Sequence, residues 1–152
     1  MLTVRQAKAG EHEILTKLAM RSEAHWGYDS DFMETFESIY GVTEAFINIH
    51  PTFVMEEKGN IVGFYSILIN NQGTSLEYFY IEPAFIGKGY GKLLWNHMVE
   101  SCKNYGIKEI VFVTSPQAKE FYTRMGAEQT GEVESLVKKG RKIPRLVYRF
   151  AY

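Results

Sequence analysis

The segment FIGKGYGKLL, residues 85–94, joins an apolar run that predicts a β-strand to a periodic run that predicts an α-helix. Its three glycines leave a backbone that can approach a ligand closely, and the first N–H groups of the helix have no partner within the helix. The peptide dipoles add positive potential at the helix start, and Lys88 and Lys92 contribute whole charges beside it. This turn therefore predicts a phosphate-binding site, with glycine used for turn geometry alone as the alternative.

Length and composition favour one domain over residues 1–152, with a core large enough to fold without disulfides or metal. The chain carries 17 basic and 18 acidic residues, a net charge of -1, which argues against nucleic acid or an anionic membrane as a partner. The single cysteine, Cys102, excludes an intramolecular disulfide and a metal cluster. The N-terminus does not resemble a signal peptide, and no stretch approaches the ~20 apolar residues of a membrane-spanning helix. We therefore expect a cytoplasmic protein.

The residues before the turn predict a short edge strand, two or three helices and three antiparallel strands. The strands are expected at residues 2–5, 52–56, 61–69 and 75–81, and the helices from residue 10 and at 31–40 and 43–49. The first helix has one apolar face, made of Ile14, Leu15, Leu18, Ala19 and Ser22. Asp29 or Ser30 caps the second helix, whose core positions are Phe32, Phe36 and either Ile39 or Tyr40.

The residues after the turn predict a long helix, a buried strand, a short helix and two final strands. Leu94, Met98, Cys102 and Tyr105 follow the apolar face of the long helix, which ends at Gly106. The strands are expected at residues 107–113, 128–137 and 143–150, and the short helix begins at Pro116. This order predicts an α/β (α+β) fold: a mixed, mostly antiparallel sheet of six or seven strands with helices on both faces.

The glycine spacing excludes two common phosphate loops. A dinucleotide fingerprint needs glycines at i, i+2 and i+5, and the third position falls on Lys92 or Leu94. A Walker loop needs a glycine where this chain has Ile86 and a Ser or Thr where it has Leu93. A short anion-binding turn at the carboxyl end of a strand remains, and that strand is antiparallel to the one before it.

Residues 78–94, together with 121–127, resemble the GNAT superfamily of acyl-CoA-dependent N-acetyltransferases. The family's loop reads Gln/Arg-x-x-Gly-x-Gly/Ala, which places Gly89 and Gly91 at the two small positions. Ile86 departs from the pattern at the Gln/Arg position, so contact with the pyrophosphate would rest on backbone amides. The resemblance covers nearly the whole chain and implies the GNAT fold, with acetyl-CoA as co-substrate and no metal.

The resemblance also implies cofactor contacts along one strand, the glycine turn and one later helix. The strand that ends at Ile81 is expected to diverge from residues 107–113 and to pair with the pantetheine arm. An amide near Phe79 would then polarise the thioester carbonyl, as an oxyanion hole does. The implied cofactor-binding residues are Phe79, Tyr80, Ile81, Ile86, Gly87, Lys88, Gly89, Tyr90, Gly91, Lys92, Ser115 and Phe121.

Two side chains are candidates for catalysis. Tyr122 stands where family members place the acid that protonates the leaving CoA thiolate, and its alternative is a core aromatic beside Phe121. Glu77 is the candidate base, with a water or a solvated carboxylate as alternatives; on a regular strand it shares a face with Phe79. His97 and His50 are weaker candidates, since surface histidines are the commoner case.

The family's acceptor pocket corresponds here to Trp26, Tyr28 and Phe32, with the basic loop 138–141 beside it. These aromatics would form a wall for a small primary amine or an amino-acid-like substrate, although core packing explains them equally well. Whether two chains pair through the C-terminal strands is left open. Two rival functions stand beside N-acetyl transfer: a non-catalytic acyl-CoA-binding or sensing module on the same fold, and a nucleotide-binding module.

Overall fold

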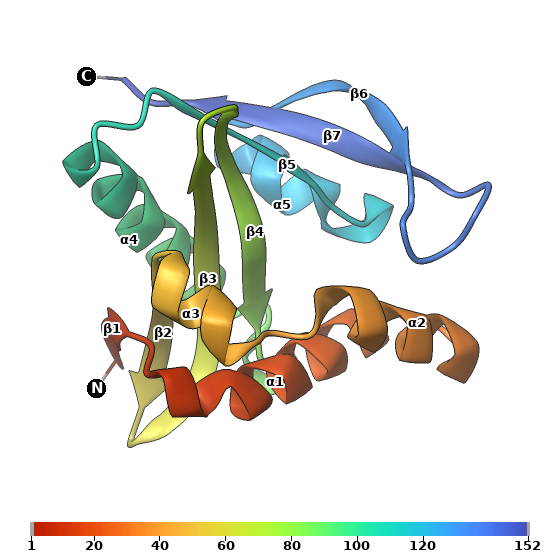
Figure 1. Ribbon diagram of the computed structural model, residues 1–152, viewed down its shortest axis with the longest axis horizontal. Helices are drawn as coiled ribbons and strands as arrows, with labels where there is room; N and C mark the ends of the chain where they lie inside the picture. Colours follow the sequence, from red (N-terminus) through yellow and green to blue (C-terminus); the bar gives the residue numbers. More distant parts are fainter. Residues whose placement is uncertain (1, 152) are drawn as a thin grey trace.

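The computed structural model describes residues 2–151, whose strands form one seven-stranded sheet in the order β1-β2-β3-β4-β5-β7-β6 (Figure 1). The strands are β1 (Leu2–Gln6), β2 (Thr52–Glu57), β3 (Asn60–Asn70), β4 (Gly73–Ile81), β5 (Glu109–Val113), β6 (Glu128–Glu134) and β7 (Lys142–Arg149). The α-helices are α1 (His12–Ala24), α2 (Ser30–Tyr40), α3 (Glu44–Ile49), α4 (Tyr90–Asn104) and α5 (Lys119–Arg124). Short 3-10 turns precede α1, α4 and α5: η1 (Ala9–Glu11), η2 (Pro83–Phe85) and η3 (Pro116–Ala118). The predicted mixed, mostly antiparallel sheet is confirmed.

Helices cover both faces of the sheet, as the apolar pattern of β3 predicts. Phe64 packs with Leu15, Leu18 and Phe36 in the core under α1, α2 and α3. The next residue of the strand, Tyr65, belongs to the opposite core, which α4 and α5 cover. The sheet is the middle layer between the two cores. A gap between two of its strands can therefore connect the two faces. Among the described residues, no helix is long and apolar enough to cross a membrane.

Such a break separates β4 from β5. The two strands are parallel and share one registered pair, Ser75 with Val111, whereas β3 and β4 are registered along most of their length. Figure 1 shows the β3–β4 hairpin running steeply away from the half of the sheet formed by β5, β7 and β6. This confirms the predicted divergence of the strand that ends at Ile81.

A β-bulge interrupts β4 at Glu77. Ser66 pairs with Tyr78 and Ile67 pairs with Leu76, which leaves Glu77 as the extra residue. A bulge changes the alternation of side chains and increases the local twist. The bulge therefore lies where β4 begins to diverge from β5. It determines the face of the sheet on which the Glu77 side chain lies.

Two apolar positions, Ile14 and Tyr105, differ from the sequence-based expectation, and the structure decides between Ile39 and Tyr40 in favour of Tyr40. Ile14 is 50% exposed, because the buried face of α1 consists of Leu15, Leu18, Ala19 and Ser22. Ile39 is 40% exposed at the end of α2, where Tyr40 is the more buried of the two. Tyr105 is 49% exposed, because α4 ends at Asn104 and the chain turns away there. For Ile14 and Tyr105 the helical period was right and the edge of the buried face was not.

Candidate active site

The glycine turn between η2 and α4 has the backbone of an anion-binding site. Gly87 and Gly89 both have φ of 84°, in the left-handed region that glycine adopts without strain, and Gly89 is the N-cap of α4. Gly91 is required for a different reason, since a Cβ atom there would lie 3.0 Å from the Phe121 ring. The three glycines therefore set both the course of the turn and its close packing against α5.

The amides of this turn are available to a ligand. The amide of Leu93 donates to the Gly89 carbonyl at 3.3 Å, and within residues 2–151 the amides of residues 87–92 show no carbonyl acceptor. Helix α4 is fifteen residues long and directs the positive end of its dipole at them. Such an array of free amides at a helix start binds phosphate groups.

The side chains of Lys88 and Tyr90, in the same turn, contact Phe85. The Lys88 ammonium lies 5.5 Å from the centre of the Phe85 ring, and the Tyr90 ring stacks on the same Phe85 ring at 5.2 Å. The Tyr90 hydroxyl donates to the carboxylate of Glu57. Lys88 and Tyr90 therefore contact Phe85 and do not line the cavity described next, whereas Ile86 and Lys92 do.

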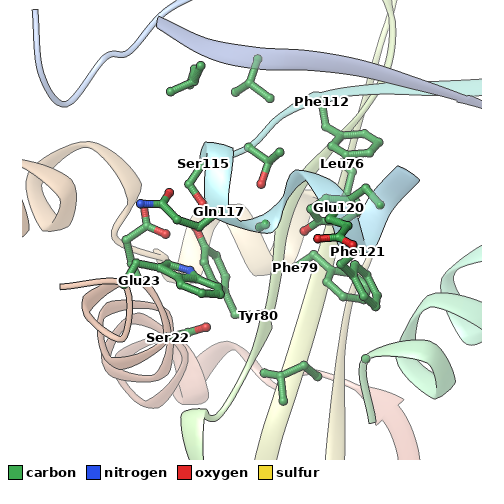
Figure 2. Close-up of a pocket in the computed structure, with 18 of the residues that line it drawn as sticks. Ser22, Glu23, Leu76, Phe79, Tyr80, Phe112, Ser115, Gln117, Glu120 and Phe121 are labelled. Carbon is green, nitrogen blue, oxygen red and sulfur yellow. The ribbon is translucent and has the colours of Figure 1, made fainter. Parts of the chain in front are cut away.

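A cavity of about 830 Å³ opens from the glycine turn through the gap between β4 and β5 to the helices α1 and α2 (Figure 2). Figure 2 shows Glu23 and Ser22 on one side of it and Phe79, Phe121 and Glu120 on the other. The structure brings most of the predicted residues to this one cavity: Trp26, Phe32, Glu77, Phe79, Tyr80, Ile81, Ile86, Gly87, Gly89, Gly91, Lys92, Ser115, Phe121 and Tyr122.

Tyr122 lies at the aromatic base of the cavity. It is 7% exposed, and its ring contacts Phe79, Phe112 and Phe121 at centroid distances of 5.9, 4.8 and 5.1 Å. Burial raises the pKa of Tyr122 far above its ordinary value, the charge of Glu23 adds to the rise, and a hydrogen bond with Thr114 opposes it. The hydroxyl is thus protonated at neutral pH, and the raised pKa makes it a weaker proton donor than an ordinary tyrosine.

Comparisons with known proteins agree with this geometry. The sequence model of the acetyltransferase (GNAT) family matches residues 16–127. The chain belongs to the GNAT family. A protein of Pseudomonas phage PaMx11 named 5-NmdU N-acetyltransferase is 28% identical over 134 residues, which cover 87% of this chain and 91% of the phage protein.

Solved GNAT structures share the fold at lower sequence identity. The PaiA N-acetyltransferase of Thermoplasma acidophilum, solved with coenzyme A, superposes with a TM-score of 0.81 at 17% identity and covers 99% of each chain. The Salmonella typhimurium protein yncA, solved with acetyl-CoA, has a TM-score of 0.70 at 19% identity, covering 100% of this chain and 95% of that one. The chain is an acyl-CoA-dependent N-acetyltransferase, and acetyl-CoA is its co-substrate.

The site of this GNAT enzyme fits acetyl-CoA in two respects. The free amides of residues 87–92 suit a diphosphate, and the unpaired stretch of β4 beyond Ser75 offers backbone groups to an extended amide-containing arm. Among the described residues, no group of three or more His, Cys, Asp or Glu side chains gathers where a metal ion could bind.

Glu77 lies on the face of the GNAT sheet that carries Tyr78. Simple alternation along β4 places it with Phe79, but the bulge turns it to the face of Tyr78, and its electrostatic neighbours are His50 and Tyr40. Burial raises the pKa of Glu77, and His50 opposes the rise. Glu77 is thus a half-buried carboxylate in the cavity, on the opposite face of the sheet from the one that alternation predicts.

The two histidines have other surroundings. His97 Nδ1 lies 2.9 Å from the hydroxyl of Tyr65, beneath α4, and burial lowers the pKa of His97. The His50 ring lies 4.7 Å from the Phe46 ring. Neither histidine lines the cavity, so proton transfer there falls to carboxylates and tyrosines.

Glu23 is a cavity residue that the sequence reasoning missed. It projects from the last turn of α1, is half-buried, and has a pKa raised by burial from its ordinary 4.5 to about 7, with Arg141 opposing the rise. A signal was present: Glu23 stands four residues after buried Ala19, so a carboxylate continues the apolar face of the helix.

A cluster of polar and aromatic side chains lies at the end of the cavity near α1 and α2. The Tyr28 hydroxyl donates to Gln117 Oε1 at 2.8 Å and accepts from Arg141. The Arg141 guanidinium lies 5.0 Å from the Tyr28 ring and 5.3 Å from the Phe32 ring, and these two rings stack at 4.0 Å. Tyr28 lines an adjoining cavity of about 510 Å³, not the main one, whereas Phe32 and Arg141 line both. The cluster ties α2 to the β6–β7 connection.

Proposed function

We propose that this GNAT enzyme transfers the acetyl group of acetyl-CoA to the primary amine of a small molecule or of an amino-acid-like substrate, by direct attack of the amine on the thioester. The observation that carries the proposal is the gap between β4 and β5. This gap joins the glycine turn, Tyr122 and a half of the cavity lined by carboxylates in one continuous space. A thioester and an amine can therefore meet there.

We assign roles to the residues of the cavity, beginning at the glycine turn. Amides of residues 87–92 hold the diphosphate, and the backbone of β4 near Phe79 orients the thioester carbonyl and polarises it. A carboxylate of the cavity receives the proton of the amine, for which Glu77 is the candidate from the sequence. Tyr122 gives its proton to the departing thiolate, whose conjugate acid has a pKa of about 8.5.

The acceptor side favours a compact amine. Trp26 and Phe32 supply aromatic surface, and Tyr28 lies at the outer end beside the basic loop that contains Arg141. Aromatic faces attract cationic groups, and an amine arrives protonated at neutral pH. The phage relative is named for 5-NmdU, so 5-NmdU belongs among the acceptors to be tried.

The test is release of CoA from acetyl-CoA across a panel of amines, each at about 1 mM, the upper range of ordinary KM values. The panel holds primary alkyl amines, amino acids, 5-NmdU and the corresponding alcohols as controls. Turnover that requires a primary amine, with mass spectrometric detection of the N-acetyl product, supports the proposal. Tight binding of acetyl-CoA with no turnover of any amine would instead indicate the non-catalytic binding module.

We also propose that the enzyme acts in the cytoplasm. Its Cys102 is buried and unpaired, which suits a reducing compartment.

If two copies associate, β6 is the expected contact, because it is an edge strand whose residues are mostly exposed. Fractionation of cells for the first proposal, and sedimentation of the purified protein for the second, are the direct measurements.

A further inference from the structure

Three carboxylates face the cavity, namely Glu23, Glu77 and Glu120. Glu120 is exposed on α5 and lies beside Phe121, on the side of the cofactor (Figure 2). Glu23 and Glu77 both face the acceptor half, one from α1 and the other from β4. The choice of base therefore rests on which of these two reaches the place where the thioester reacts.

Glu23 and Glu77 differ in the tyrosines on which their charges act. Burial raises the pKa values of Tyr80 and Tyr122, and the strongest charge that adds to both rises is that of Glu23. The charge of Glu77 acts on Tyr40 and Tyr78, which lie beneath α2 and α3. Figure 2 shows Glu23 on the same side of the cavity as Tyr80, pointing from α1 toward Ser115 and Gln117. The charge of Glu23 thus acts on Tyr122, the residue assigned to the leaving thiolate, and the charge of Glu77 acts on Tyr40 and Tyr78.

We propose that Glu23, and not Glu77, binds the ammonium group of the acceptor and takes its proton. The proposal rests on the function proposed above and names the catalytic carboxylate of that function. Within residues 2–151, the structure shows no ion pair and no side-chain hydrogen bond to the Glu23 carboxylate. A half-buried carboxylate without a partner is a site for a cation, since burial of an unpaired charge is costly.

The surroundings of Glu23 suit this task. The titratable and charged groups that face it are Arg141 from the β6–β7 connection, Tyr28 after α1, Tyr40 on α2, Tyr80 on β4 and Tyr122 on α5. Arg141 is held by the Tyr28 hydroxyl and by the Tyr28 and Phe32 rings, so its charge is fixed at a distance and does not neutralise Glu23 as a direct partner. A base with a pKa of about 7 is also well matched to proton transfer at neutral pH.

The reaction balances with these two residues. Glu23 accepts one proton from the ammonium group, and the neutral nitrogen attacks the thioester carbon. The C–N bond forms, the C–S bond breaks, and the sulfur leaves as a thiolate that receives the proton of the Tyr122 hydroxyl. The nitrogen loses its second proton as the amide forms, and that proton restores Tyr122. Glu23 then releases its proton to solvent, so an ammonium ion and acetyl-CoA yield the amide, CoA and one proton.

The test compares Glu23→Gln with Glu77→Gln, a matched variant of the other acceptor-side carboxylate. We expect kcat/KM for the amine to rise with pH through about 7 in the wild-type enzyme, as Glu23 loses its proton. Glu23→Gln should lower kcat/KM by about 100-fold at neutral pH and abolish this acidic limb, with CoA affinity unchanged. In Glu77→Gln, kcat/KM should still rise with pH through about 7. Glu23→Asp should have a higher kcat/KM than Glu23→Gln.

Thermal unfolding gives a readout that does not depend on turnover. Folding raises the pKa of Glu23, so the folded protein loses stability as the pH rises toward about 7. Glu23→Gln should therefore melt above the wild type at about pH 8, and the difference should close toward about pH 5.

The outcomes separate the two proposals. An active wild type whose rate and acidic limb survive in Glu23→Gln overturns the role of Glu23 and leaves the function in place, as does loss of the limb in Glu77→Gln alone. A wild type that binds acetyl-CoA and acetylates no amine overturns both.

Discussion

Replacement of Tyr122 by phenylalanine tests the proposed proton donor, because it removes one hydroxyl and keeps the ring. The ring contacts with Phe79, Phe112 and Phe121 are unchanged, so the expected loss of stability is that of one buried hydroxyl group, about 1 kcal/mol. For a chain of 152 residues this corresponds to a fall in Tm of about 2–4 °C. The variant should therefore fold.

The loss of turnover should be much larger than the loss of stability. General acids contribute about 10²–10⁴ in rate, and a thiolate is a weakly basic leaving group that needs less help than an alkoxide. We therefore expect kcat to fall by about 10- to 100-fold in Tyr122→Phe, with the Kd of CoA within about threefold of the wild-type value. Since burial raises the pKa of Tyr122, its ionisation should cause no loss of activity up to about pH 10.

The assay is steady-state release of CoA, with CoA binding measured by calorimetry and Tm by differential scanning. Tyr65→Phe is the matched control, because Tyr65 is fully buried and its hydroxyl bonds His97 and Ser101 under α4, outside the cavity. It should lose at least as much stability as Tyr122→Phe while its kcat changes by less than about twofold. Wild-type turnover in Tyr122→Phe would remove Tyr122 from the chemistry.

Three further predictions follow from the turn, the loop and the core. Gly89→Ala places a side chain at φ of 84°, costing about 1–2 kcal/mol, and should raise the KM for acetyl-CoA by about 10-fold as the amides shift, measured by initial rates. Arg141→Met removes the positive charge that opposes the raised pKa of Glu23, so the acidic limb of kcat/KM should move to higher pH. Leu15→Ala empties a fully buried position under α1 and should cost about 2–5 kcal/mol in urea-induced unfolding.

Each of these variants has a control elsewhere in the chain. Gly140→Ala carries the same φ of 84° in the β6–β7 connection and should cost stability without raising the KM for acetyl-CoA. Arg149→Met removes an exposed positive charge that pairs with Glu128, and should leave the acidic limb in place. Ile14→Ala changes a residue that is 50% exposed, and should cost less than about 1 kcal/mol. Equal effects in a variant and its control would contradict the corresponding reasoning.

The sequence was sufficient for features that depend on residues close together in the chain. Helical and strand periods predicted the order of the elements, since a buried face repeats with the geometry of its own backbone. The spacing of Gly87, Gly89 and Gly91 predicted a turn between a strand and a helix, and the structure places this turn before α4 with left-handed backbone at Gly87 and Gly89. The family resemblance marked Tyr122, which the fold brings to the same cavity as that turn.

Tertiary structure alone decided how the acceptor half is built. The face of Glu77 depends on a bulge set by its pairing with β3, and regular alternation could not reveal it. The raised pKa of Glu23 arises because α1 buries that carboxylate in the cavity that runs through the gap between β4 and β5, and Arg141 opposes the rise. Burial and charge act through space between segments more than fifty residues apart, so a reading of local patterns detects the glycine turn and misses the carboxylate that faces it across the cavity.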